Sequence, residues 1–335
     1  MSIEGSAILW KERKRTMDIS LEPIVSTLAR QPRPVGSPGY YHAREWLPQW
    51  MEEVGLVPYR GDAFQLSYKA PSFSDFANFV GMLPGKKARE PAILLGAHYD
   101  TVPGCPGADD NAAAIAVIFE VVSRISRMHR TRPIIAAFFD AEEPPYFLSE
   151  SMGSKRFHED QLRHKVDCAL ILDLVGHDVP LTGFEDLLFV TGIESHPHLD
   201  AMIQNNPGVP GLRILPTQNR YIGDMSDHHV FRLAGVPYLF FSCGRWNHYH
   251  APSDRPQVLN YQKMGAIVAY LERLLPGLDR RSLGGVQKPH DTTPTELKFF
   301  NTILGFALRS YGLKRLSSRQ DIDRVVSLFM QQFRL

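Results

Sequence analysis

Apolar residues follow two different spacings along the chain, and each spacing predicts a different kind of element. Residues 19–30 and 40–54 carry apolar positions three and four apart, which is typical of helices that bury one face. Residues 31–39, rich in Pro and Gly, separate these two stretches. We expect a loop there, because neither Pro nor Gly readily continues a helix.

From residue 76 onward, short runs rich in apolar residues predict strands. Several runs are almost wholly apolar, as expected of strands buried on both faces of a sheet. Helical stretches such as residues 112–128 separate them, which is the alternation typical of parallel strands. The expected strands are residues 77–83, 92–97, 134–139, 169–174, 187–191 and 238–242. The pattern predicts an α/β fold with a mixed, mostly parallel central sheet sandwiched by helices.

The chain becomes polar beyond about residue 276 and then helical again. Residues 295–311 and 318–333 have amphipathic spacing, and Thr293 and Ser318 stand where hydroxyl groups would cap the two helices. We expect a C-terminal helical appendage that packs on the main domain, with a dimer contact or a lid over the active site as alternatives. The expected division is an N-terminal segment at 1–18, a main domain at 19–278, and a linker and appendage at 279–335.

Composition and charge exclude several classes of protein. The 335 residues are 44% hydrophobic and 22% charged, which fits a globular chain and not a disordered one. Because 37 basic residues balance 36 acidic ones, no overall charge attracts nucleic acid or a membrane surface. Three scattered cysteines indicate neither a disulfide framework nor a cysteine zinc site. No secretory signal or apolar run of about 20 residues is visible, so we expect a soluble, cytoplasmic protein.

Acidic residues and histidines follow one expected strand after another. The carboxyl ends of parallel strands meet at one edge of a sheet, where ligands bind. Each residue alone has an ordinary explanation as a solvated side chain or a helix cap, but together they offer the oxygen and nitrogen ligands that zinc accepts. The residues at strand ends or helix starts are His98, Asp100, Asp109, Asp110, Glu142, Glu143, Asp173, Tyr249 and His250.

Such a set suits a site with two metal ions. One carboxylate can bridge two divalent ions about 3.5–4 Å apart, leaving positions open for a shared water. The adjacent Glu142 and Glu143 then fit two roles, because neighbouring side chains diverge at a strand end. One of them can bind metal while the other acts as a general base toward that water.

Six motifs in this order resemble metallopeptidase family 28, which contains the co-catalytic zinc aminopeptidases and, as a divergent branch, the animal glutaminyl cyclases. The resemblance covers residues 31–276, including the early stretch at 32–37. The motifs are GAHYDTV at 96–102, PGADDNA at 106–112, DAEE at 140–143 with MGS at 152–154, LDL at 172–174, SDH at 226–228 and YHAPSD at 249–254.

The resemblance implies a role for each residue of the site. Asp110, rather than Asp109, matches the bridging ligand, because Ala113 occupies the place of the small residue that follows the family's bridge by three positions. Two zinc ions are implied for an aminopeptidase and one for a cyclase. The implied roles are His98 and Asp173 as ligands of one zinc, Glu143 and His250 as ligands of the other, Glu142 as general base, Asp100 as the acid that orients His98, and Tyr249 as the residue that polarises the scissile carbonyl.

Two departures bear on the reaction. Nine residues, 144–152, separate the Glu pair from Gly153, where typical members have about four, and cyclases also have an insertion there. Cyclases retain counterparts of these ligands and of Asp227, but Tyr249 stands where they have tryptophan. We therefore expect an aminopeptidase acting on peptides with a free N-terminus, with glutaminyl cyclase as the alternative.

Two further alternatives are a family 20 deacylase or dipeptidase and a receptor-like binding module. The first normally inserts a domain between the ligands that match Asp173 and His250, and only 77 positions separate these residues. The intact Glu142 argues against the second. We expect the substrate pocket to involve residues 144–152, 222–227 and 244–249, with Phe147 and Trp246 either lining it or simply packed. A homo-oligomer formed through the C-terminal helices is a further expectation.

Overall fold

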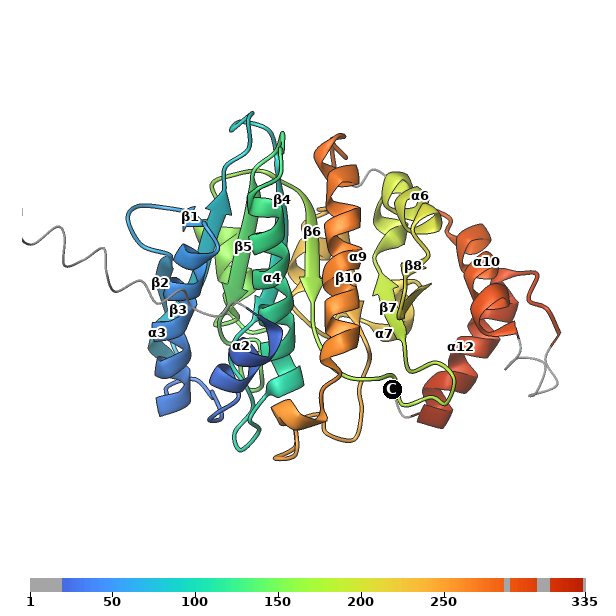
Figure 1. Cartoon of the computed structure of the whole chain (residues 1–335), viewed down its shortest axis with the longest axis horizontal. Coiled ribbons are helices and arrows are strands. Elements are labelled where there is room, and N and C mark those ends of the chain that lie inside the picture. The colour runs from blue at the N-terminus through green and yellow to red at the C-terminus, as the bar shows by residue number, and fades with distance from the viewer. Residues whose placement is uncertain (1–19, 286–289, 306–313, 334–335) are drawn as a thin grey trace, which may run out of the picture.

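A ten-stranded mixed sheet runs through the computed structural model, which describes residues 20–285, 290–305 and 314–333. The strand order is β1-β3-β5-β4-β6-β10-β7-β9-β8, with β2 paired to β3 (Figure 1). The strands are β1 Val57–Pro58, β2 Gln65–Ala70, β3 Phe73–Leu83, β4 Ala92–His98, β5 Ile134–Phe139, β6 Val166–Leu172, β7 Leu187–Thr191, β8 Gly208–Val209, β9 Leu212–Pro216 and β10 Tyr238–Ser242. The expected mixed sheet is confirmed: the central β5, β4, β6 and β10 run parallel, and β7 and β9 are parallel to each other. The remaining pairs are antiparallel.

Helices pack on both faces of this sheet. In Figure 1, α2, α3, α4 and α9 lie in front of it. Phe157 and Phe231 pack with sheet residues on the other face, in a separate hydrophobic cluster. The helices are α2 Leu21–Leu28, α3 Pro38–Glu53, α4 Ala114–Ser126, α5 Gly153–Arg156, α6 Pro197–Asn205, α7 Asn219–Ile222, α8 His228–Leu233, α9 Tyr261–Asp279, α10 Thr293–Ile303 and α12 Arg319–Phe333.

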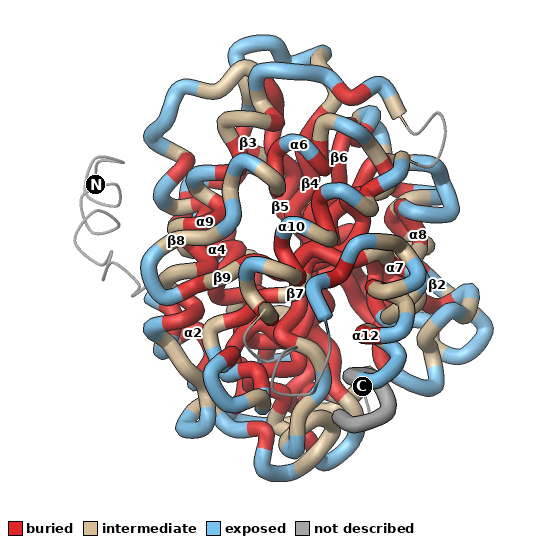
Figure 2. Tube along the Cα trace, turned by 90° about the vertical axis from the view of Figure 1, so that its right-hand side faces the viewer, coloured by how far each residue is buried: buried red, intermediate tan, exposed pale blue. Residues whose placement is uncertain are grey.

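The central strands are buried on both faces, as their apolar runs predict. All residues of β4 and β5 are buried, and Figure 2 shows the sheet as the buried interior of the molecule. Because side chains alternate along a strand, Leu95 joins the cluster beneath α4 while Leu94 joins the cluster on the opposite face. Burial on both faces holds the carboxyl ends of these strands at one edge.

The prediction of a loop over residues 31–39 is wrong at its C-terminal end, because α3 already begins at Pro38. Pro38 and Gly39 form the first turn of α3, and the Ser37 side chain accepts a hydrogen bond from the Tyr40 backbone N–H. Pro is tolerated at the first helical position, because its missing N–H would have no partner there. Sequence reasoning also missed β1, β2, β8 and β9. β1 and β8 have two residues each, and β2 is half-exposed. β9 is mostly buried, but Arg213 interrupts its apolar run.

The two C-terminal helices share the larger hydrophobic core. Phe299, Phe300 and Ile322 are buried in the same cluster as the strands. At the start of α12, Ser318 and Asp321 cap one another: the Asp321 N–H donates to the Ser318 hydroxyl over 3.2 Å, and the Ser318 N–H donates to the Asp321 carboxylate over 3.0 Å. This confirms the helix start expected at Ser318.

Parts of the expected organisation lie outside the described residues. These are the N-terminal segment at 1–18 and the end of the helix expected at 295–311. The division at residue 278 stays a prediction. Within the described residues, no helix is both long enough and apolar enough to cross a bilayer.

Candidate metal centre

Adjacent parallel strands bring the predicted site residues together. His98 is the last residue of β4, and Asp173 follows β6, which pairs with β4. The Glu pair follows β5 on the other side of β4. Asp110 lies in a kinked turn, Ala108–Ala113, where its own backbone is not helical and which leads into α4. His250 lies in the loop after β10. Residues up to 152 positions apart in the sequence thus converge on one edge of the sheet.

Two groups of potential ligands share Asp110. Its Oδ1 lies 3.2 Å from His98 Nε2, and Asp173 Oδ1 lies 3.6 Å from the same nitrogen. Its Oδ2 lies 3.2 Å from His250 Nε2, and Glu143 Oε2 lies 3.0 Å from that nitrogen. In each group the ligand atoms lie within 4.8 Å of one another. Each oxygen of Asp110 therefore faces a different imidazole, which is the arrangement of a bridging carboxylate.

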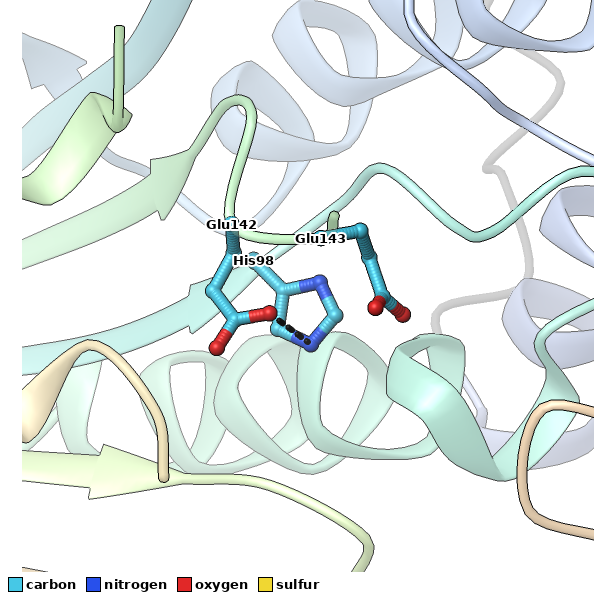
Figure 3. A group of neighbouring side chains, drawn as sticks. All are labelled: His98, Glu142 and Glu143. Carbon is cyan, nitrogen blue, oxygen red and sulfur yellow. Dashed lines mark ion pairs between the residues drawn. The ribbon is translucent and has the colours of Figure 1, made fainter. Parts of the chain in front are cut away.

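The two neighbouring glutamates point to different partners. Figure 3 shows both extending from the loop after β5, with an ion pair between Glu142 and His98. Glu142 Oε2 lies 3.9 Å from His98 Nε2, whereas Glu143 reaches His250. Both side chains line one cavity. The divergence expected for adjacent residues at a strand end is present, and it leaves Glu142 outside the two groups joined by Asp110.

The donor atoms fit a bound cation better than they fit one another. His98 is fully buried, yet neither of its ring nitrogens makes a hydrogen bond. Asp173 Oδ1 and Glu143 Oε1 are also buried without a hydrogen-bond partner. Buried polar atoms are normally hydrogen-bonded, so a cluster of unpartnered atoms that converge needs another explanation. Nitrogen and carboxylate donors in this number suit one or two divalent ions such as zinc.

The electrostatics of the centre also favour a bound cation. Burial and the neighbouring carboxylates raise the pKa of Glu142 well above its usual value and that of Glu143 to about 8. Burial lowers the pKa of His250, but hydrogen bonds to Asp110 and Glu143 outweigh it and raise that pKa to about 9. Without a metal these groups hold protons at neutral pH, because several carboxylates share one buried space. A divalent ion would supply the positive charge instead.

Asp100 contacts the backbone of the glutamate pair as well as His98. Its Oδ1 lies 3.5 Å from His98 Nδ1, as the resemblance implies. Its two oxygens also accept hydrogen bonds from the backbone N–H groups of Glu142, over 3.0 Å, and Glu143, over 3.1 Å. One carboxylate thus fixes both the imidazole and the backbone of the glutamate pair.

Asp109 is turned away from the centre. Its Oδ1 accepts a hydrogen bond from the Gly176 N–H over 2.7 Å, and its Oδ2 lies 2.6 Å from His177 Nδ1. Both oxygens are therefore engaged elsewhere, whereas those of Asp110 face the two imidazoles. The geometry favours Asp110 over Asp109 as the bridging residue.

Sequence reasoning assigned no role to two residues that hold the Asp110 turn. Asp254 accepts hydrogen bonds from the backbone N–H groups of Asp109 and Asp110, over 2.8 and 3.1 Å. The fully buried Arg33 donates to the carbonyls of Pro106 and Gly107, over 2.7 and 2.9 Å. Both stand in stretches that carry the resemblance, at 249–254 and 32–37. Their position in those stretches was the only available signal.

Backbone strain is concentrated around the centre. Among the described residues, four that are not glycine have positive φ, and three of them belong to this site: Ala141 at 53°, Leu174 at 54° and His250 at 54°. A left-handed conformation costs an L-residue roughly 1–2 kcal/mol. Such strain gathers at functional sites, where the surrounding structure fixes the backbone. Ala141 precedes the glutamate pair, and Leu174 follows Asp173.

A cavity of about 250 Å³ opens from these ligands. Tyr249 lines it, with its ring 3.8 Å from that of His250, and burial raises the pKa of Tyr249 so that its hydroxyl keeps its proton. Two of the expected pocket segments contribute, 222–227 and 244–249. The lining residues from these segments are Ile222, Met225, Gly244, Arg245 and Tyr249.

The third expected segment, 144–152, does not line this cavity. Tyr146 in this loop packs against the Phe76 ring of β3, 5.4 Å between centroids, and the Ser151 carbonyl accepts a hydrogen bond from the Tyr68 hydroxyl of β2. Aromatic packing thus draws the loop onto the β2–β3 hairpin. Phe147 and Trp246 do not line the cavity either, and Trp246 stacks on His177 at 4.3 Å.

Comparison with known proteins adds a family and a fold. The model of peptidase family M28 matches residues 78–274. Aminopeptidase YwaD of Bacillus subtilis is 26% identical over 232 residues, which are 63% of this chain and 48% of YwaD. The chain spans 14% to 64% of the length of the curated relatives compared.

Two solved structures share the fold. Glutaminyl cyclase of Porphyromonas gingivalis superposes with a TM-score of 0.63 at 19% identity, covering 77% of this chain and 96% of the cyclase. A Zn-dependent exopeptidase of Parabacteroides distasonis gives a TM-score of 0.62 at 15% identity, covering 76% of this chain and 96% of the exopeptidase. The fold is shared with a glutaminyl cyclase and with an exopeptidase, so the fold does not separate cyclisation from peptide hydrolysis.

Proposed function

The chain belongs to peptidase family M28, and from this premise we propose that it is a zinc aminopeptidase that removes the N-terminal residue of peptides. Family membership supports a hydrolase of the metallopeptidase class. The finer assignment, to N-terminal residues and to two zinc ions, rests on the geometry of the centre. The aminopeptidase YwaD, 26% identical, supports the same choice.

One observation carries the proposal: the two oxygens of Asp110 face two different imidazoles, each 3.2 Å away. Each imidazole has a second carboxylate beside it, Asp173 for His98 and Glu143 for His250. This is the donor set for two ions held side by side, with His98, Asp173 and Asp110 on one and Glu143, His250 and Asp110 on the other. The resemblance implies two zinc ions for aminopeptidases and one for cyclases.

Divalent ions at this position would polarise the scissile carbonyl and lower the pKa of a water molecule in the same space. Glu142 is placed to handle the proton. It lies beside the centre without belonging to either group joined by Asp110, and burial raises its pKa, which suits a group that takes a proton and returns it. We assign Glu142 to deprotonate the attacking water and then to protonate the leaving amine.

Two further residues complete the assignment. Asp100 holds His98 and the backbone of the glutamate pair in place, so it acts as a positioning residue. Tyr249 lines the cavity beside His250 with its hydroxyl protonated, so it can donate a hydrogen bond to the oxygen on which negative charge develops.

The experiment that tests this function is mass spectrometry of a mixed pool of short peptides, some beginning with glutamine. The pool is incubated with zinc-loaded protein and with a chelated control. We expect loss of whole N-terminal residues, which depends on the metal. Loss of ammonia from glutamine peptides alone would overturn the proposal in favour of a glutaminyl cyclase, the activity of the Porphyromonas gingivalis protein that shares the fold. No change in any peptide would also overturn it.

The expected homo-oligomer is part of this proposal. The C-terminal helices bury Phe299 and Ile322 in the larger hydrophobic core, which leaves exposed side chains such as Leu328 on α12 for contact with a second copy. Light scattering after size-exclusion chromatography measures the mass directly. A mass of about 38 kDa at micromolar concentration would contradict it.

A further inference from the structure

The cavity beside the metal centre has a second, apolar half that the proposed reaction does not explain. Its charged lining consists of the ligands, Glu142 and Arg245, which lies over the ring of Tyr249. Away from them, the wall is formed by residues of β7 and β9, of the loop 179–181, of α7 and of the two C-terminal helices. The apolar lining residues there include Leu187, Phe189, Leu215, Phe300, Leu304 and Val326.

We propose that α10 and α12 form the wall of the pocket that receives the side chain of the substrate's N-terminal residue, and that this wall selects large apolar side chains. The inference rests on the proposed aminopeptidase function, which places that residue at the metal centre. It also gives the C-terminal helices a part in substrate binding. The family match ends at residue 274, before both helices, so membership of the family does not imply this wall.

The positions of the helices support the inference. Phe300 and Leu304 lie one helical turn apart and are 3% and 2% exposed, so they present a continuous apolar surface from the end of α10. Val326 of α12 lines the same cavity. Figure 1 shows both helices at the β8 and β9 end of the sheet, and Figure 2, seen from that end, shows α7, α10 and α12 around β7.

A polar clamp fixes this wall. Arg319 of α12 forms an ion pair with the fully buried Glu296 of α10, and Glu296 also accepts a hydrogen bond from the Thr292 hydroxyl over 2.7 Å. Asp323 of α12 accepts a hydrogen bond from the hydroxyl of Tyr221, whose side chain lines the cavity. The clamp joins α10, α12 and α7, so all three helices meet the cavity in a defined arrangement.

The size and chemistry of the cavity define the substrate class. At about 250 Å³ it exceeds the roughly 150 Å³ of an apolar protein cavity that admits benzene. Its apolar half offers Thr217, Tyr221 and Ser242 as polar groups, and the charged lining residue Arg245 lies over the Tyr249 ring, 4.8 Å from its centroid, beside the metal centre. A charged substrate side chain in the apolar half would therefore stay unpaired. N-terminal leucine, methionine and phenylalanine fit it, whereas alanine leaves it largely empty.

The test compares two substitutions of the same kind on α12. Val326→Trp narrows the pocket, whereas Ser327→Trp, at an exposed position of α12 that does not line it, is the control. Zinc-loaded full-length proteins are assayed on the 4-nitroanilides of leucine, phenylalanine and alanine. We expect Val326→Trp to lower kcat/KM for leucine and phenylalanine at least tenfold with little change for alanine, since pocket contacts of this size discriminate by about 10- to 200-fold.

Phe300→Ala is a second variant, and calorimetry is a second measurement that does not depend on turnover. Phe300→Ala should widen the pocket and shift the preference from leucine toward phenylalanine. A uniform change for all substrates, in both variants, would overturn the proposal. If the wild type cleaves no anilide, the peptide pool shows whether the aminopeptidase function itself has failed, and calorimetry with norleucine and alanine then tests the wall independently of turnover. Tighter binding of norleucine that Val326→Trp abolishes would support it, and equal or absent binding would overturn it.

Discussion

The two halves of the cavity are stabilised in opposite ways. In the polar half, buried carboxylates and imidazoles converge with donor atoms that lack hydrogen-bond partners. Burial, together with the neighbouring carboxylates, raises the pKa of Glu142 and Glu143. In the apolar half, Phe300 and Leu304 bury hydrocarbon against the core. The polar half therefore needs a ligand to be stable, whereas the apolar half is stable by itself and keeps space for a side chain. Catalysis and selectivity can consequently be altered separately.

The largest effect is expected from Glu142→Gln. The amide keeps the shape of the side chain but cannot take a proton, so turnover should fall by roughly 10²–10⁴-fold. Metal content, measured by mass spectrometry of the digested protein, should stay at two zinc ions. Glu150→Gln, at an exposed position of the loop 144–152, is the control. Substantial turnover by Glu142→Gln would remove Glu142 from the role of base.

Asp110→Asn tests whether Asp110 bridges the two ions or only lies near them. Loss of the shared carboxylate should reduce the bound zinc from two ions to one or fewer, because an amide bridges cations poorly. The neighbouring Asp109→Asn should keep both ions, since Asp109 bonds to Gly176 and His177 instead. Two tightly held zinc ions in Asp110→Asn would identify Asp109 as the bridging residue.

Metal removal should destabilise the whole protein. A ligand that binds only the folded state at 100 times its Kd adds about 2.7 kcal/mol of stability. Chelation should therefore lower Tm by roughly 4 °C, because an unfolding entropy of about 2.1 cal/mol/K per residue gives about 0.7 kcal/mol/K for 335 residues. Differential scanning fluorimetry with and without chelator measures this, and Asp110→Asn should show a smaller difference. An unchanged Tm would mean that the polar half is stable without metal.

The smallest effect is expected beside the apolar half, at Asp224. Burial acts to raise the pKa of Asp224, but bonds to Arg232 and His229 outweigh it and lower that pKa to about 2 from 3.8. A lowered pKa means that the carboxylate contributes stability above pH 3.8 and that the contribution disappears as the pH falls toward 2. Because the ion pairs are partly exposed, Asp224→Asn should cost at most about 1 kcal/mol at pH 7.

Urea unfolding at pH 7 and at pH 2.5 measures that difference, with Asp62→Asn at an exposed position as the control. The cost should shrink at the lower pH. A cost that is equal at both pH values would show that the charge of Asp224 does not carry the effect.

The residues of the metal centre were predictable because they follow apolar strands. His98, Glu143 and Asp173 each come at or just after a continuous apolar run, and the pairing of β4 with β5 and β6 places those ends side by side. A short segment such as β1 carries no comparable signal. The distinction between Asp109 and Asp110 needed the structure, because adjacent residues differ in direction, and direction depends on packing.

The pocket was harder to predict than the centre. The loop 144–152 was expected at the cavity because it is long and follows the glutamate pair, but packing of Tyr146 on Phe76 draws it onto the β2–β3 hairpin. Phe300 and Val326 carry no sign in the sequence of lining a pocket, because ordinary core residues have the same helical spacing.

The sequence by itself determined the α/β fold, the edge of the sheet at which the chemistry gathers and the residue types that gather there. Local rules suffice for these, because strand patterns and strand-end residues are written in consecutive positions. Only the tertiary structure decided that Asp110 faces both imidazoles, that Asp254 and Arg33 hold its turn, and that two C-terminal helices form the apolar wall of the cavity. Each of these depends on side chains distant in the sequence meeting in space, which periodicity along the chain does not record.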